Sequence, residues 1–156
     1  YPGLMVEDGR LNVLEYNARF GDPECQVLMT RFEGDLVTLL RAIADGQLAD
    51  VDAPEFSSDT ALTVVMAAKG YPGTPDKGGA IHLPEINAAM IFHAGTALKD
   101  GQLVANGGRV LNVTARGRNV TEAQARAYAA VDAVDFPSGF CRRDIGWREV
   151  AREAGD

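Results

Sequence analysis

The segment EYNARFGDPE, from Glu15 to Glu24, constrains the fold and chemistry of this chain more than any other stretch. Its first polar residues, Glu15, Asn17 and Arg19, are spaced two apart. Because successive side chains of a strand point to opposite faces, an extended backbone places all three on one side. A carboxylate, an amide oxygen and a guanidinium side by side are typical of metal and phosphate binding. The row therefore suggests metal and phosphate chemistry at the end of a strand.

The residues before this polar row predict the strand itself. Leu11 and Val13 share the face of Glu15 in a regular strand, so that face changes from apolar to polar along its length. Leu14 and Tyr16 point to the opposite face, and we expect them in a core.

The residues after the row predict a turn and then a helix. Gly21 is expected in a turn or at a close backbone approach. Asp22 is the expected helix N-cap, Pro23 the first helical residue, and Glu24 a first-turn carboxylate that favours the helix dipole. The strand is thus expected to run directly into a helix.

The polar row has two interpretations from the residues alone. Mg²⁺ prefers oxygen ligands and commonly combines one or two protein groups with substrate phosphates, so Glu15 and Asn17 would suit it. Arg19 could then grip a phosphate or a carboxylate as a fork. Alternatively, the row is a solvated strand end with one ion pair between Glu15 and Arg19. The spacing does not decide between the two.

Six motifs follow one another along the chain: EYNARFGDPECQ, GDLVTLLRAIADGQL, VVMAAKGYPG, IFHAGTAL, NGGRVLNVTARG and FCRRDIGWREV. In this order they resemble the C-terminal part of the phosphoribosylamine-glycine ligases (glycinamide ribonucleotide synthetases) of the ATP-grasp superfamily. The resemblance runs from about Leu4 to Ala151, and six ordered motifs are far more specific than any one of them.

The resemblance implies a chemistry and roles for the polar row. Enzymes of this family use ATP and Mg²⁺ or Mn²⁺ to phosphorylate the carboxylate of glycine. The amine of 5-phosphoribosylamine then attacks glycyl phosphate, which gives glycinamide ribonucleotide, ADP and phosphate for purine biosynthesis. By the resemblance, Glu15 and Asn17 are metal ligands, and Arg19 is a catalytic residue near the transferring phosphate. Phosphoryl transfer depends on positioning and charge neutralisation, which such a set supplies.

Further residues are candidates for substrate binding, each with a structural alternative. Asp22 and Glu24 also suit the start of a helix, and a histidine in an apolar strand is more often a hydrogen-bonded structural residue. The glycines of residues 106–109 and 69–73 also suit a bulge or a turn. The candidates are Asp22, Glu24, His93, Gly95, Thr96, Gly108 and Arg109.

Composition narrows the class of partners and the compartment. The chain has 156 residues, a net charge of −7 and a pI near 4.8, which argues against nucleic acid and anionic membrane surfaces. It contains two cysteines, Cys25 and Cys141, which we expect to be ordinary thiols, and no long apolar run. A reducing cytoplasm is therefore expected. We further expect residues 142–144 to form surface ion pairs and Trp147 to lie in the core.

The patterns and the resemblance predict an α+β fold in three parts. Residues 1–48 are expected to be the end of an ATP-grasp domain, with a strand hairpin turning at residues 7–9 and two helices. Residues 49–60 are the expected linker, because prolines, serines and acids interrupt the periodicity. Residues 61–156 are expected to form a small C-terminal α+β domain with a mainly antiparallel sheet.

Individual elements are predicted from local signals. Asp35 is the expected N-cap of a helix that ends at Gly46, and Thr121 and Gln124 form an expected capping box for a later helix. An apolar stripe on the first of these helices is expected in the core: Leu36, Leu39, Leu40 and Ile43. The expected helices are 23–32, 35–46 and 122–134, and the expected strands are 4–6, 11–19, 61–68, 89–98 and 102–115.

The motifs that the family carries upstream, an amine-binding domain and the segments for adenine and the phosphate-covering loop, find no match here. The chain is therefore expected to be a fragment whose partners are the missing segments, and which alone binds metal weakly and does not ligate. Two alternatives stay open: a related ATP-grasp carboxylate-amine ligase, and a non-catalytic scaffold or interaction module.

Overall fold

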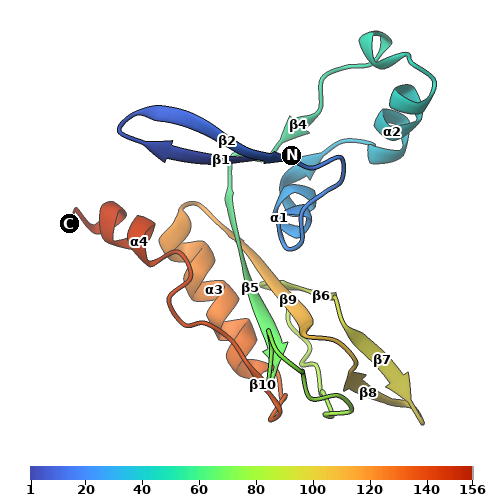
Figure 1. Ribbon diagram of the computed structural model, residues 1–156, viewed down its shortest axis with the longest axis vertical. Coiled ribbons are helices and arrows are strands. Elements are labelled where there is room, and N and C mark those ends of the chain that lie inside the picture. Colours follow the sequence, from blue (N-terminus) through green and yellow to red (C-terminus); the bar gives the residue numbers. More distant parts are fainter. Residues whose placement is uncertain (156) are drawn as a thin grey trace.

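The computed structural model describes residues 1–155 and divides into two regions, residues 1–58 and residues 59–155 (Figure 1). The N-terminal region contains β1 (Pro2–Glu7), β2 (Arg10–Tyr16), α1 (Glu24–Arg31), β3 (Phe32–Glu33), α2 (Leu36–Ala44), the 3₁₀ turn η1 (Leu48–Asp50) and β4 (Glu55–Phe56). The C-terminal region contains β5 (Thr60–Ala68), β6 (Met90–His93), β7 (Thr96–Lys99), β8 (Gln102–Ala105), β9 (Arg109–Gly117), α3 (Val120–Ala133), β10 (Gly139–Phe140) and α4 (Trp147–Ala154).

The core lies in the C-terminal region, between one sheet and one helix. The sheet has the order β10-β5-β9-β6, and every neighbouring pair is antiparallel. Val64, Leu111 and Val113 are fully buried on β5 and β9, and α3 packs over them with small residues such as Ala123 and Ala127. Small side chains on α3 let its backbone approach the sheet closely. The predicted α+β fold with a mainly antiparallel sheet is confirmed.

Two glycines break the strands that the sequence predicts as continuous. The expected strand 89–98 is interrupted between β6 and β7, and the expected strand 102–115 is interrupted between β8 and β9. A Cβ atom on Gly95 would overlap the carbonyl oxygen of Arg109 and lie 2.9 Å from Cα of Gly107. The two backbones are therefore in direct contact, and β7 and β8 leave the sheet as a separate ribbon that turns at Asp100 and Gly101.

The start of α3 differs from the predicted capping box. The side chain of Asn119, not Thr121, caps the helix and accepts a hydrogen bond of 2.9 Å from the backbone N–H of Glu122. The hydroxyl of Thr121 instead donates to Glu153 on α4 at 2.6 Å. Helix α4 is not among the helices that the sequence predicts. Trp147, its first residue, is 50% exposed, so the prediction that Trp147 lies in the core is wrong.

The N-terminal hairpin contains a β-bulge that alters the predicted faces. It turns at Asp8 and Gly9, both with positive φ, as expected. Leu4 pairs with Val13 and Gly3 pairs with Glu15, so Leu14 is an extra residue without a partner. Consecutive residues lie on opposite faces, and Val13 and Glu15 therefore lie on opposite faces, not on one as predicted.

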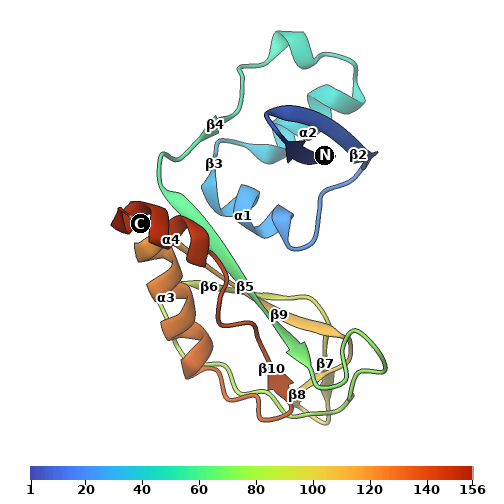
Figure 2. The same ribbon diagram turned by 60° about the vertical axis from the view of Figure 1, so that its left-hand side comes forward.

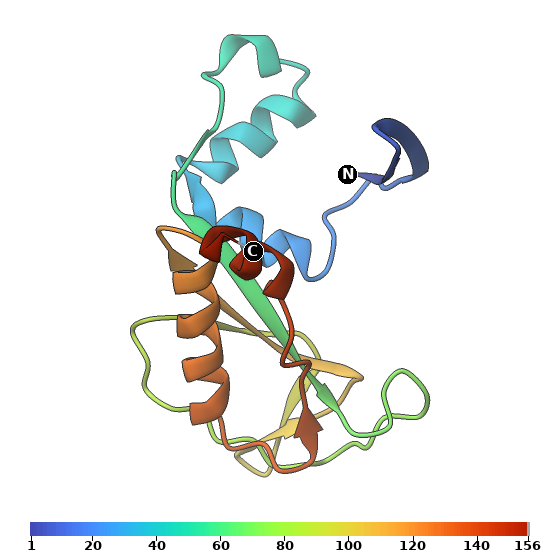
Figure 3. The same cartoon turned by 90° about the vertical axis from the view of Figure 1, so that its left-hand side faces the viewer.

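The bulge divides the hairpin into a polar and an apolar face. By the register, Asn12 joins Glu15 on the polar face. The other face carries Leu4, Val6, Leu11, Val13 and Tyr16. Leu14 is 65% exposed and Tyr16 is 82% exposed, so the prediction that they lie in a core is wrong within this chain. The hairpin stands apart from the sheet in Figure 3, and in residues 1–155 no layer covers its apolar face.

The helices of the N-terminal region are where the sequence predicts them, but their ends and burial differ. Asp35 caps α2 as expected, and its carboxylate accepts from the N–H of Val37 at 2.9 Å. Pro23 rather than Asp22 is the N-cap of α1, and no side chain caps that helix, so the predicted role of Asp22 is wrong. The apolar stripe of α2 is not core, because Leu40 and Ile43 are exposed.

The expected linker is partly ordered. It contains η1 and then β4, which pairs with β3 through Phe32 and Phe56, whose rings meet edge to face at 5.7 Å. From there the chain enters β5 and joins the two regions (Figure 2). Among residues 1–155, no helix is both long enough and apolar enough to cross a membrane.

Candidate functional site

Glu15 and Asn17 lie at the paired end of the hairpin. The ladder continues one residue past β2, because the N–H of Asn17 donates to the carbonyl of Tyr1 at 2.8 Å and the amine of Tyr1 donates back at 2.6 Å. Glu15 and Asn17 therefore share a face, as predicted. Gly3 lies opposite Glu15, and a Cβ atom there would approach Cγ of Glu15 to 3.1 Å. The glycine leaves room for the carboxylate to cross the neighbouring strand.

Arg19 does not continue this row. The backbone bends at residues 18 and 19, so the predicted strand 11–19 ends early. The guanidinium of Arg19 donates to the carbonyl of Phe20 at 2.9 Å. Within residues 1–155 no ion pair joins Arg19 to Glu15, so the structure lacks the surface ion pair of the alternative interpretation.

The bend places three candidates around one cavity of about 430 Å³. Asn17, Arg19 and Glu24 line it, and they come from the end of the hairpin, the bend and the first turn of α1. Gly21 is buried, and a Cβ atom on it would overlap the carboxylate of Glu24, so its close neighbour is a side chain and not the backbone. The remaining lining residues are Tyr1, Ala18, Phe20, Gly21 and Leu28.

Asn17 lines this cavity, and Glu15 lies beside it on the same face of the hairpin. The side-chain amide nitrogen of Asn17 is buried and has no hydrogen-bond partner among residues 1–155. A carboxylate and an amide provide oxygens of the kind that Mg²⁺ prefers when it completes its shell with water and phosphates, so these two side chains could hold such an ion. In this part of the chain no three His, Cys, Asp or Glu side chains gather as a self-sufficient metal centre.

Asp22 connects this segment to the sheet. Its carbonyl accepts from Nη1 of Arg109 at 2.7 Å, and its carboxylate lies 3.2 Å from Nη2 of the same residue. The carboxylate also accepts from the side-chain amides of Asn112 at 3.2 Å and Gln26 at 3.4 Å. Neither amide was a sequence candidate, although an asparagine between Leu111 and Val113 in a buried strand is an unusual residue that could have been noticed.

The remaining candidates lie around the breaks between β6 and β7 and between β8 and β9. Gly95 contacts the backbone of Arg109, and the ring of Tyr71 lies against Gly108. A hydrogen bond of 2.9 Å joins Nδ1 of His93 to the hydroxyl of Thr96. The fold thus brings Gly95 against Arg109 and His93 against Thr96, and the roles of these residues in substrate binding stay predictions.

Residues 142–144 and Cys141 have the ordinary roles that the sequence predicts. Arg142 pairs with Asp144 and Arg143 pairs with Asp132, so the predicted surface ion pairs are confirmed. The hydrogen bond from Arg142 lowers the pKa of Asp144. Burial raises the pKa of the Cys141 thiol, which disfavours the reactive thiolate and agrees with an ordinary cysteine.

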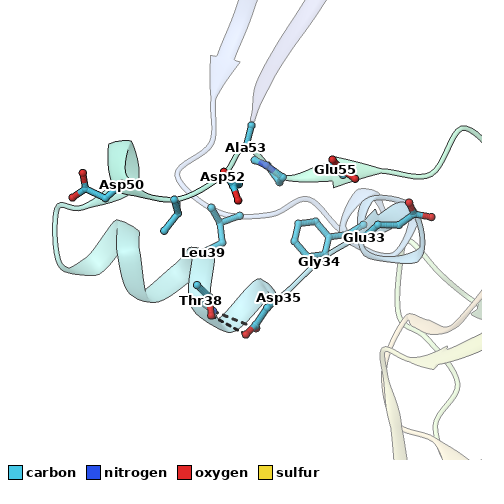
Figure 4. A pocket seen from close by; sticks show the side chains of 12 residues that line it. Glu33, Gly34, Asp35, Thr38, Leu39, Asp50, Asp52, Ala53 and Glu55 are labelled. Atoms are coloured by element: carbon cyan, nitrogen blue, oxygen red, sulfur yellow. Dashed lines mark hydrogen bonds between the residues drawn. The ribbon is translucent and has the colours of Figure 1, made fainter.

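The hollow beside α2 is acidic but is not a metal centre. It has a volume of about 550 Å³ and lies between α2, η1 and the β3–β4 pair (Figure 4). Asp35 is occupied by its hydrogen bonds to Thr38, and the carboxylates of Asp50 and Glu33 point away from one another. Its carboxylates are Glu33, Asp35, Asp50, Asp52 and Glu55.

Comparison with known proteins decides the family. The profile described as "Phosphoribosylglycinamide synthetase, C domain" matches residues 61–148, more than half of the chain. The chain belongs to the phosphoribosylglycinamide synthetase family. The matched profile is that of the C domain, so the resemblance to the C-terminal part of these enzymes is confirmed.

Relatives in this family extend the match to almost the whole chain. A phosphoribosylamine-glycine ligase of Mesorhizobium japonicum is 61% identical over 98% of the chain, and one of Agrobacterium fabrum is 62% identical. A chloroplastic one of Arabidopsis thaliana is 48% identical. The chain spans 36% of the length of the two bacterial relatives and 30% of the plant one.

A solved structure shows the same fold. The crystal structure of a phosphoribosylamine-glycine ligase from Thermotoga maritima superposes with a TM-score of 0.77 at 42% identity. The match covers 92% of this chain and 35% of the other. Nearly the whole of this chain therefore has the fold of the matching part of that ligase.

Proposed function

We propose that the chain is the C-terminal part of a cytoplasmic, ATP-dependent phosphoribosylamine-glycine ligase. The complete ligase joins glycine to 5-phosphoribosylamine through glycyl phosphate and releases glycinamide ribonucleotide, ADP and phosphate. Family membership supports this, together with the names of relatives that are considerably longer than the chain. Residues 1–48 are the end of the ATP-grasp domain, residues 49–60 the linker and residues 61–156 the C-terminal domain.

One observation carries the proposal to specific residues. Glu15 and Asn17 share the polar face at the paired end of the hairpin, beside the cavity that Arg19 lines. Glu15 and Asn17 hold the Mg²⁺ or Mn²⁺ ion, and Arg19 lies near the transferring phosphate. When bound, the metal neutralises charge on the phosphates.

The chain's own residues contribute by positioning. The backbone hydrogen bonds between Tyr1 and Asn17 extend the ladder by one pair and keep Asn17 on the face of Glu15. The carboxylate of Glu24 packs against Gly21, and both residues line the cavity. Substrate contact stays a prediction for Asp22, Glu24, His93, Gly95, Thr96, Gly108 and Arg109.

The experiment that tests this proposal removes the metal ligands in the protein expressed from its complete gene. We expect Glu15→Gln and Asn17→Ala each to lower kcat by about a hundredfold or more, because charge stabilisation worth several kcal/mol depends on the metal. The measurement is glycine-dependent release of phosphate from ATP. Glu7→Gln is the matched control, because Glu7 lies on the same face of the same hairpin at its far end.

Unchanged kcat in both variants would favour a non-catalytic scaffold instead. Equal turnover with another amino acid or carboxylate in place of glycine would favour a related carboxylate-amine ligase. Residues 1–156 alone are expected to give no turnover, since two oxygen ligands leave Mg²⁺ largely hydrated.

A further inference from the structure

Asp22 lies at the centre of the contact between the two regions. It precedes α1, which packs against β5 and β9 on the face of the sheet away from α3 (Figure 1 and Figure 3). Two of its partners, Arg109 and Asn112, belong to β9 and are separated from it by 87 and 90 residues of sequence. The loop of residues 18–24 is therefore hydrogen-bonded to the sheet through Asp22.

Arg109 binds both the backbone and the side chain of Asp22. Nη1 donates to the carbonyl at 2.7 Å, and Nη2 lies 3.2 Å from the carboxylate. A planar guanidinium can satisfy two such acceptors at once, whereas a lysine ammonium can align with only one of them well. Arg109 therefore holds the backbone of Asp22 in place and also pairs with its carboxylate charge.

The buried amides around Asp22 are oriented towards its carboxylate. Asn112 is fully buried, and its amide nitrogen donates to Asp22 while its oxygen has no partner among residues 1–155. Gln26 shows the same pattern, with its nitrogen directed at Asp22 and its oxygen buried and unpaired. Leaving a buried amide oxygen unpaired costs free energy. Both amides nevertheless direct their nitrogen at Asp22, so the contact between α1 and β9 is organised around one carboxylate.

The position of Asp22 determines the position of the cavity. Arg19 and Glu24 line the cavity on either side of it in sequence, and Gly21, its neighbour, packs against Glu24. A displacement of Asp22 would therefore move both walls. We propose that Arg109 is a positioning residue of the ligase site: it holds Asp22, and through Asp22 the loop 18–24. This inference rests on the proposed function.

Kinetic coupling in the protein expressed from its complete gene tests the inference. We expect Arg109→Ala and Asp22→Ala each to lower kcat/KM for glycine about tenfold, and the double variant to lose little more than the worse single one. Residues that act through one contact are non-additive in this way. Arg109→Lys should recover part of the loss. A double variant with the product of both losses, about a hundredfold, would overturn the inference, because it would mean that Arg109 acts independently of Asp22.

Hydrogen exchange supplies a readout that does not depend on ligase activity. The N–H of Cys25 donates to the carbonyl of Gly21 at 3.0 Å, so peptides covering residues 18–25 report on the loop. In Arg109→Ala, or in Arg109→Lys if the first variant does not fold, these amides should exchange about tenfold faster while those of β5 are unchanged. Arg152→Ala, which removes an exposed ion pair within α4, is the matched control and should change neither.

Unchanged exchange at residues 18–25 would overturn the positioning role. Absence of glycine-dependent turnover in the parent protein would contradict the proposed function alone, and the exchange result would still decide whether Arg109 holds the loop.

Discussion

The β1–β2 hairpin and the β5–β9 pair are both antiparallel, yet they differ in what they bury. Residues along β5 and β9 alternate into a core that α3 closes, and Val64, Leu111 and Val113 are completely buried there. The hairpin has an equally apolar face, but its residues are exposed. The difference lies in the second layer, since a strand pair buries side chains only when another element packs on it.

This comparison shows where the stability of the chain resides. A two-stranded ribbon is marginally stable by itself, whereas the sheet with α3 has a closed core. We therefore expect residues 59–155 to determine the free energy of unfolding and residues 1–58 to respond locally. The candidate metal ligands consequently lie in the less stable region.

The sharpest test substitutes one leucine in each region. Leu111→Ala removes a fully buried side chain from β9 and should lower the free energy of unfolding by about 2–5 kcal/mol. Leu14→Ala removes an exposed, unpaired residue from β2 and should change it by less than about 0.5 kcal/mol. Denaturant titration followed by circular dichroism measures both.

Equal losses from the two leucine variants would break the comparison. They would show that the hairpin unfolds together with the sheet, and that its exposed face is not a separate unit.

A smaller effect is expected from the glycine contact within the sheet region. Gly95→Ala would push a methyl group into the carbonyl of Arg109, and should cost about 1–3 kcal/mol because two backbones would have to separate. Gly9→Ala is the counterpart in the hairpin, where a Cβ atom meets nothing within 4 Å. It should strain the turn only and leave the global unfolding midpoint nearly unchanged. A larger shift from Gly9→Ala than from Gly95→Ala would reverse the ranking of the regions.

The smallest effect concerns a carboxylate that links α4 to α3. Hydrogen bonds from the hydroxyl of Thr121, and then from the N–H groups of Thr121 and Val120, lower the pKa of Glu153. A carboxylate with a lowered pKa in the folded state stabilises the fold above its unfolded pKa, and that stabilisation is lost as pH falls through the folded pKa. Glu153→Gln should therefore lower Tm slightly at pH 7, and the gap to the parent should close below about pH 4. A constant gap at both pH values would exclude this cause.

Local signals predicted much of the fold. The turn at Asp8–Gly9, the Asp35 cap and strand β5 depend on neighbouring residues, and the structure has all of them. The failures share a different cause. The breaks at Gly95 and Gly107 depend on a contact between two loops, and the exposure of Trp147 depends on how α4 packs against α3. No periodicity in the sequence contains such contacts.

The candidate site was predictable to the same extent. The spacing of Glu15 and Asn17 gave a shared face, because both stay on the ladder. Arg19 could not be placed, since the bend at residue 18 depends on how the chain returns to α1. The partners of Asp22 were equally hidden, because Asn112 is 90 residues away and nothing local marks it as a donor to a carboxylate.

The bulge in β2 has a consequence for how this strand can vary in length. Leu14 is the one residue of the strand without a partner, so a chain lacking it would keep Gly3 opposite Glu15 and Leu4 opposite Val13. Deletion of Val13 would likewise remove the bulge, with Leu14 taking its place opposite Leu4. The bulge is therefore where the strand can lose a residue and still present Glu15 to the same side.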